Sequence, residues 1–343
     1  MNRIPTLDGW RGIAILLVLV THLQISLLGR LYHGYPWMNL GQHGVGLFFV
    51  LSGYLITSLL LREDKIDLPA FYMRRFFRLM PVAWLYLLVL AVAGLVAGQT
   101  FVGNDAWACL GFFRNYFPAH ETAQNFRTGH FWSLSLEEQF YLLWPPILAL
   151  AERKWALGIA GAAAIACAVF RFLHWQAYNQ VFLAQRSTVR FDALLVGCIF
   201  ALLLQSQPVR AWFQQHGTWL FWVLLPVLLW HIDRYQMLIP LSESVTMAVM
   251  MVSTSLSPAS FVGRVLEYRH LKFLGVISYS LYVWQQAVLF IPLPRMGALL
   301  LPLVGIMSYG MIERPCIAFG RRAVERFRHA EAGRPPAPCE AAD

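Results

Sequence analysis

The chain has 343 residues, of which 58% are hydrophobic and 13% are charged. Soluble domains carry about 25% charged residues, and apolar runs recur here from residue 10 to residue 313, which excludes a soluble domain with a single anchor. The net charge of +9 is assigned to loops that flank a membrane, because no basic-aromatic module indicates nucleic acid.

Residues 8–29 form the first apolar run and are predicted to be a helix with an arginine near its start and a histidine in its middle. Arg11 and His22 are eleven residues apart, so they lie within roughly 20° of one stripe and roughly 16 Å apart along the axis. With Arg11 at a headgroup layer, His22 lies near the membrane midplane. An ionisable group at that depth favours a functional site; the alternative is a neutral histidine hydrogen-bonded inside a bundle. No cleavage site follows the run, so we expect a retained helix.

Residues 40–58 hold four glycines, which indicate close packing between helices. His43 lies at the outer entrance of this predicted span. It either reaches the same cavity as His22 or is an ordinary interfacial histidine.

The segment 74–81 places Arg75 and Arg78 three residues apart on one helical face, at the cytoplasmic start of a span. Pro81 suits the first turn of that helix. The arginines are either a positive-inside anchor or a clamp for a phosphorylated cytosolic donor, since guanidinium binds phosphate in bidentate fashion.

Residues 130–146 contain a second set of polar side chains within an apolar helix. Ser133, Glu137 and Tyr141 follow i, i+4, i+8 spacing and share a face, while Ser133 or Ser135 suits the helix start. A carboxylate bonded to an imidazole fixes its tautomer and raises its basicity. We therefore predict that Glu137 and His22 form a general-base pair.

The sequence predicts an all-α fold, a polytopic bundle of about ten transmembrane helices with both termini cytoplasmic. The orientation places the basic segments at 62–79, 152–154, 257–272 and after 313 on the cytoplasmic side. Residues 105–118 are short and interrupted by Arg114 and Asn115, and are expected to be re-entrant or interfacial. The predicted spans are 10–29, 43–61, 80–98, 132–151, 155–173, 190–205, 217–231, 238–256, 273–291 and 296–313.

The predicted domains are a membrane domain at 1–316 and a basic cytoplasmic tail at 317–343, disordered over 329–343. No further domain is expected after the last span, so acceptor recognition is expected from loops and cavity. The five cysteines are scattered without a Cys-x-x-Cys pair, so neither a metal site nor a disulfide framework is predicted.

Seven motifs in order give the chain a resemblance to the acyltransferase-3 family of integral membrane O-acyltransferases. They are LDGWRGIAILLVLVTH (7–22), GVGLFFVLSGYLIT (44–57), RFFR (75–78), WSLSLEEQFYLLWP (132–145), RFDALLVG (190–197), LGVISYSLYVWQ (274–285) and SYGMIERP (308–315). Two positions depart from the family pattern: Gly46 stands where an acid is usual, and Gln285 stands where a histidine is often found.

The resemblance implies transfer of an acyl group, with acetyl favoured, from cytosolic acyl-CoA to a hydroxyl of a carbohydrate or glycoconjugate. It implies an enzyme of a bacterial-type inner membrane with no bound cofactor. His22 is the expected base, Glu137 and Tyr141 belong to the active-site signature, and Tyr141 or Ser135 is expected to hold the oxyanion. Arg11, Arg75 and Arg78 are expected to handle the donor.

A different class of function also fits buried His and Glu residues, which can form a proton relay in a transporter or flippase. The chain lacks an internal repeat and paired broken helices, which are typical of transporters. Proton-coupled transport of a small or lipid-linked solute is therefore the alternative prediction.

Overall fold

The computed structural model describes residues 4–28, 40–98, 106–117, 126–174, 185–234, 240–291 and 293–331, and every regular element in these ranges is helical. Each of the ten predicted spans overlaps a helix. The helices that overlap the first five are α1 (Pro5–Leu28), α2 (Leu40–Leu60), α3 (Leu68–Val96), α5 (Phe131–Leu150) and α6 (Arg153–Leu173). Those that overlap the other five are α7 (Ser187–Leu203), α8 (Gln207–Arg234), α9 (Leu241–Leu256), α11 (Arg269–Val276) with α12 (Ser278–Leu289), and α13 (Pro294–Ser308).

Fewer than ten segments are long and apolar enough to cross a membrane by length and composition. Five described helices pass this test, and a sixth span results if α7 and α8, which meet at a bend of 106°, count as one. The remaining predicted spans are shorter or more polar: α9 has 16 residues and α12 has 12. The described part of the chain is therefore an all-helical bundle with five or six candidate membrane spans.

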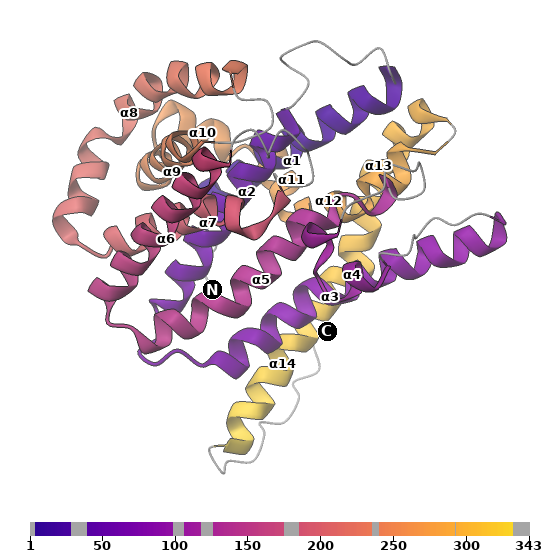
Figure 1. Ribbon diagram of the computed structural model, residues 1–343, viewed down its shortest axis with the longest axis horizontal. Helices are drawn as coiled ribbons and strands as arrows, with labels where there is room; N and C mark the ends of the chain where they lie inside the picture. Colours follow the sequence, from indigo (N-terminus) through magenta and orange to yellow (C-terminus); the bar gives the residue numbers. More distant parts are fainter. Residues whose placement is uncertain are drawn as a thin grey trace.

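The second helix is the most enclosed of these candidates. In the 18-residue apolar stretch of α2, 72% of the residues are buried, whereas 28% are buried in the corresponding stretch of α6. Helices α1 and α7 pack along it, and α8 curves around the outer edge of the bundle (Figure 1).

Glycine lets α2 and α7 approach at backbone distance. A Cβ atom built on Gly53 would lie 1.9 Å from the carbonyl oxygen of Leu194, and one on Gly197 would lie 2.2 Å from that of Val50. The close packing expected from the glycines of 40–58 is thus present at Gly53.

A Gly53→Ala variant is expected to lose about 1–3 kcal/mol of stability, because neither backbone can yield without moving a whole helix. The matched control is Gly158→Ala in α6, where nothing lies within 4 Å of the new methyl group. That control should gain about 0.5–1 kcal/mol from helix propensity. Thermal unfolding in detergent measures both, and equal effects of the two substitutions would contradict the close approach.

The third helix begins earlier than predicted. Asp67 caps α3 by accepting a hydrogen bond from Ala70 N–H, and Pro69 follows in the first turn. Burial acts to raise the pKa of Asp67, but that hydrogen bond and the Arg328 guanidinium, 2.9 Å away, hold it below its usual value. The prediction that Pro81 lies in the first turn is wrong: Pro81 lies inside α3, because the capping signal at Asp67 comes earlier.

The chain ends in a long helical column. Helix α13 passes through a π-helical turn, η7 (Tyr309–Glu313), into α14 (Arg314–Glu331), which projects beyond the rest of the molecule (Figure 1). Helix α14 runs through the predicted domain boundary after residue 316 without a break. Most of the predicted disordered end, 329–343, lies outside the described residues.

The segment predicted to be short and interrupted contains only small elements in its described part. Helix α4 (Ala106–Leu110) has five residues, Phe112 has a positive φ of 58°, and η3 (Arg114–Tyr116) is a 3₁₀ turn. Two further small elements are the 3₁₀ turn η4 (Phe126–Thr128) and α10 (Phe261–Leu266).

Candidate active site

Three arginines meet between α1 and α3. Arg11 comes from α1, Arg75 and Arg78 come from α3, and all three line both of two adjoining cavities. The guanidinium carbon of Arg75 lies 4.0 Å from the centre of the Tyr141 ring. Neither Arg75 nor Arg78 forms an ion pair with a carboxylate of the described ranges, and the Nε atom of Arg78 is buried without a partner there. Guanidinium groups that line a cavity can bind an anion.

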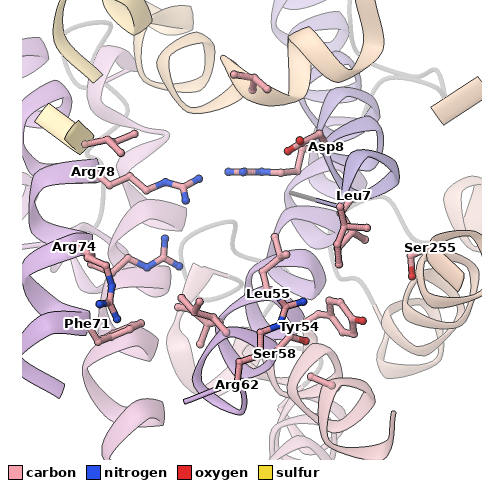
Figure 2. Close-up of a pocket in the computed structure, with 18 of the residues that line it drawn as sticks. Leu7, Asp8, Tyr54, Leu55, Ser58, Arg62, Phe71, Arg74, Arg78 and Ser255 are labelled. Carbon is pink, nitrogen blue, oxygen red and sulfur yellow. The ribbon is translucent and has the colours of Figure 1, made fainter. Parts of the chain in front are cut away.

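The larger cavity has a volume of about 730 Å³ and contains four further arginines. Figure 2 shows Arg74 and Arg78 extending from one wall, with Leu7 and Asp8 on the opposite wall and Arg62 beside Tyr54 and Ser58 below. Ile4 near the N-terminus and Arg321 of α14 line the same cavity. The two ends of the described chain therefore lie at the same end of the bundle.

The smaller cavity, about 90 Å³, extends from the three arginines into the bundle. Ser133, Glu137 and Tyr141 all line it, which confirms that they share a face of α5. The Ser52 hydroxyl donates to Glu137 Oε1 over 2.8 Å. The Glu137 carboxylate also interacts electrostatically with Arg75, Arg11 and Arg78.

His22 lies one helical turn beyond this cavity. Its Nδ1 atom is 2.9 Å from the Val18 carbonyl oxygen, so Nδ1 carries the proton and Nε2 keeps a free electron pair. The Nε2 atom is 3.3 Å from the amide nitrogen of Gln286. Gln286 follows Tyr282, which lines the cavity, by one turn of α12.

The Gln286 amide bridges two histidines. Its oxygen accepts hydrogen bonds from the backbone N–H and the Nδ1 atom of His130, 3.2 and 2.8 Å away. The Nε2 atom of His130 is buried without a partner among the described residues. Sequence reasoning missed Gln286 and His130, although a histidine directly before a predicted intramembrane helix was an available signal.

A pair of hydroxyl groups separates the cavity from the histidines. Ser133 Oγ and Tyr282 Oη are 2.5 Å apart, and both side chains line the cavity. Tyr282 also donates to the His130 carbonyl oxygen over 3.4 Å. A path of polar groups thus leads from the arginines, past Glu137 and this pair, to His130, Gln286 and His22.

Two predicted contacts are absent from the described site. His22 and Glu137 have different hydrogen-bond partners and do not form the predicted pair, because Glu137 lies at the level of the arginines. Ser135 lies away from the cavity: its hydroxyl accepts the Arg114 backbone N–H over 3.1 Å. Two residues along α5 turn Ser135 by roughly 200° from Ser133 and Glu137, so it faces the opposite side.

His43 is predicted either to reach the same cavity as His22 or to be an interfacial histidine, and it does neither. Its Nδ1 atom lies 2.6 Å from Glu243 Oε1 of α9, and the two side chains are 1% and 0% exposed. This correction places His43 in a buried pair between α2 and α9.

Two adjacent glutamines offer a matched test of the bridge. Gln286→Met is expected to lower stability by about 1–3 kcal/mol, because it leaves buried imidazole groups without partners. Gln285 is 0% exposed and neither of its amide atoms has a partner among the described residues, so Gln285→Met should cause no such loss. Thermal unfolding of both variants in detergent measures the difference, and equal losses would refute the bridging role.

Comparison with known proteins identifies the chain's relatives. A family model described as an acyltransferase domain, that of acyltransferase-3, matches residues 4–310. YrhL of Bacillus subtilis, which has the provisional name of peptidoglycan O-acetyltransferase, is 29% identical over 94% of this chain and 56% of its own length. The peptidoglycan O-acetyltransferase OatA of Listeria monocytogenes is 26% identical over 85% of this chain and 50% of its own length. No solved structure matches the chain.

Proposed function

Because this chain belongs to the acyltransferase-3 family, we propose that it transfers a short acyl group from cytosolic acyl-CoA to a hydroxyl of a cell-envelope carbohydrate. The chain spans about half the length of the curated relatives it matches. Two of them are named for peptidoglycan O-acetylation, which favours acetyl and a glycan acceptor.

One observation carries the proposal: a large arginine-lined cavity adjoins a small cavity inside the bundle, and Arg11, Arg75 and Arg78 line both. Coenzyme A has a bulky, multiply phosphorylated head and a narrow pantetheine arm that ends in the thioester. The head fits the larger cavity, where guanidinium groups bind phosphate. The arm fits the narrower path toward Glu137 and Tyr282.

The small cavity supports a short acyl group. Its volume of about 90 Å³ is small beside the volume of about 730 Å³ of the larger cavity, which favours a short acyl group at the end of the donor arm over a long acyl chain.

His22 is proposed to take the proton of the acceptor hydroxyl as that oxygen attacks the thioester carbonyl carbon. The C–S bond then breaks, and the departing CoA sulfur takes up that proton, so the products are an ester and free CoA. The free electron pair on the Nε2 atom of His22 suits this role, and the hydrogen bond of His22 to Val18 fixes the tautomer. Glu137 is assigned to the donor passage, since it faces the arginines, and Tyr141 holds Arg75 by its ring. The acyl group reaches His22 past the Ser133–Tyr282 pair.

The orientation is proposed from the same cavity. Its arginines and the two ends of the described chain lie together, and basic residues concentrate on the cytoplasmic side of membrane proteins. We therefore infer that both termini are cytoplasmic, which requires an even number of spans, as in the predicted bundle of about ten. The acceptor then approaches from the opposite side of an inner (plasma) membrane.

Vesicles with a defined orientation test the function. Acetyl-CoA with a labelled acetyl group, supplied on the cytoplasmic side only, should yield free CoA there and a labelled ester on glycan at the other side. Mass spectrometry identifies both products. Solute uptake driven by a pH gradient, with no release of CoA, would instead establish the transporter alternative.

A further inference from the structure

The arginines of the larger cavity form two tiers. Arg11, Arg75 and Arg78 are half-buried and shared with the smaller cavity, so they form the inner tier. The outer tier lines only the larger cavity and consists of Arg62, Arg74, Arg210 and Arg321. Arg74 is engaged by Glu63, 3.1 Å away. The other three are exposed and form no ion pair with a described carboxylate.

Two members of the outer tier line the cavity together with two hydroxyl groups, those of Tyr54 and Ser58. Arg62 follows the end of α2 and Arg210 lies in the first turn of α8, and both interact electrostatically with the buried Tyr54. Ser58 lies one turn further along α2 than Tyr54. Figure 2 shows Arg62, Tyr54 and Ser58 together, on a different wall from Arg74 and Arg78. Two guanidinium groups and two hydroxyl groups from two helices therefore face the same cavity.

We propose that Arg62 and Arg210, with Tyr54 and Ser58, form a separate subsite for a phosphate monoester, the 3′-phosphate of the coenzyme A donor. This inference rests on the proposed function, since it assigns a further part of the same donor. A phosphate monoester has three terminal oxygen atoms and carries nearly two charges at neutral pH. Two guanidinium groups from different helices, together with hydroxyl donors, can bind more of these oxygen atoms than a single guanidinium group can.

The two tiers explain how one cavity can hold both the pyrophosphate and the 3′-phosphate of the donor. The pyrophosphate continues directly into the pantetheine arm, so it belongs at the inner tier, where the narrow cavity begins. The 3′-phosphate branches from the ribose, away from the arm, and so belongs at the outer tier. The apolar side chains between the tiers, including Leu55 and Phe71, then face the adenosine.

Binding of adenosine phosphates to the purified full chain tests the subsite without turnover. Adenosine 3′,5′-bisphosphate should bind about tenfold more tightly than adenosine 5′-phosphate, since one charge-assisted contact is worth about that factor. The Arg62→Ala, Arg210→Ala double variant should lose this preference. The matched control is Arg264→Ala, because Arg264 is exposed but does not line the cavity. Equal affinities in the wild type, or an undiminished preference in the double variant, would overturn the proposal.

Transfer kinetics separate failure of the subsite from failure of the function. In the wild type, acetyl-3′-dephospho-CoA should show a KM about tenfold above that of acetyl-CoA, and the double variant should bring the two values together. Transfer from both donors with equal KM in the wild type refutes the subsite alone. No transfer from either donor refutes the proposed function and the subsite with it.

A phospholipid headgroup is a second source of phosphate monoester chemistry at an exposed rim. The preference is therefore measured in nanodiscs of neutral lipid and in nanodiscs that contain phosphatidic acid. If the subsite binds the donor, the preference for the 3′-phosphate is present in nanodiscs of neutral lipid. Phosphatidic acid then only competes with the adenosine phosphates for the site. A preference of the wild type for phosphatidic acid over the bisphosphate, lost in the double variant, would assign the site to lipid and overturn the proposal.

Discussion

A His22→Ala variant is expected to lose acyl transfer by about 10²–10⁴-fold, the usual contribution of a general base. The tautomer of His22 leaves its Nε2 atom able to accept a proton, and the contact of that atom to the Gln286 amide is long, at 3.3 Å. The loss should be in kcat, because His22 does not line either of the cavities proposed to hold the donor. Labelled acetyl transfer by the purified protein measures it.

Two variants make the result specific to base catalysis. His22→Asn should be as inactive as His22→Ala but closer to wild type in stability, because an amide can keep a hydrogen bond to the Val18 carbonyl oxygen. His130→Ala removes the other end of the Gln286 bridge and tests which imidazole is the base. Full activity in a folded, inserted His22→Ala protein would remove this histidine from the mechanism.

Replacing both Arg75 and Arg78 with alanine should raise the KM for acyl-CoA far more than the KM for the acceptor. Charge-assisted contacts to phosphate are worth roughly 1.5–3 kcal/mol each, which corresponds to tenfold or more in affinity for each arginine. Steady-state kinetics with each substrate varied in turn measures the two constants.

Lysine substitutions separate donor binding from membrane orientation. Arg75→Lys should restore donor affinity only in part, because lysine lacks the bidentate fork and the stacking of guanidinium over Tyr141. If these arginines only fix orientation by the positive-inside rule, lysine restores the wild type fully. An unchanged KM for acyl-CoA in a correctly inserted double alanine variant would exclude the donor clamp.

Relations along one helix could be predicted from the sequence because helical geometry fixes them. Arg11 and His22 lie in one continuous helix, and Ser133, Glu137 and Tyr141 line one cavity. The meeting of Arg11 with Arg75 and Arg78 followed from placing all three at the same membrane face. These predictions needed only residue spacing and the side of the membrane.

Relations between helices could not be predicted in the same way. Glu137 bonds to Ser52, 85 residues away, and His22 contacts Gln286, 264 residues away. The partner of His43 is 200 residues distant, on α9. Which side chains meet across two helices depends on how each is rotated about its axis and on their crossing, and local periodicity does not encode either.

The π-helical turn between α13 and α14 makes the last helix sensitive to a change in chain length. A π turn holds one residue more than the α-helical path it replaces, and one residue corresponds to about 100° of rotation. Within this π turn, Glu313 accepts a hydrogen bond from Ser280 over 2.7 Å. Further along α14, Phe319 packs on Phe77, and Arg321 lines the larger cavity. Deleting one residue from 309–313 would restore regular pairing and turn every later side chain away from its partner at once. Insertions and deletions in this short segment should therefore be tolerated far less well than substitutions, and relatives that lack the extra residue must place their basic residues on a different face of the last helix.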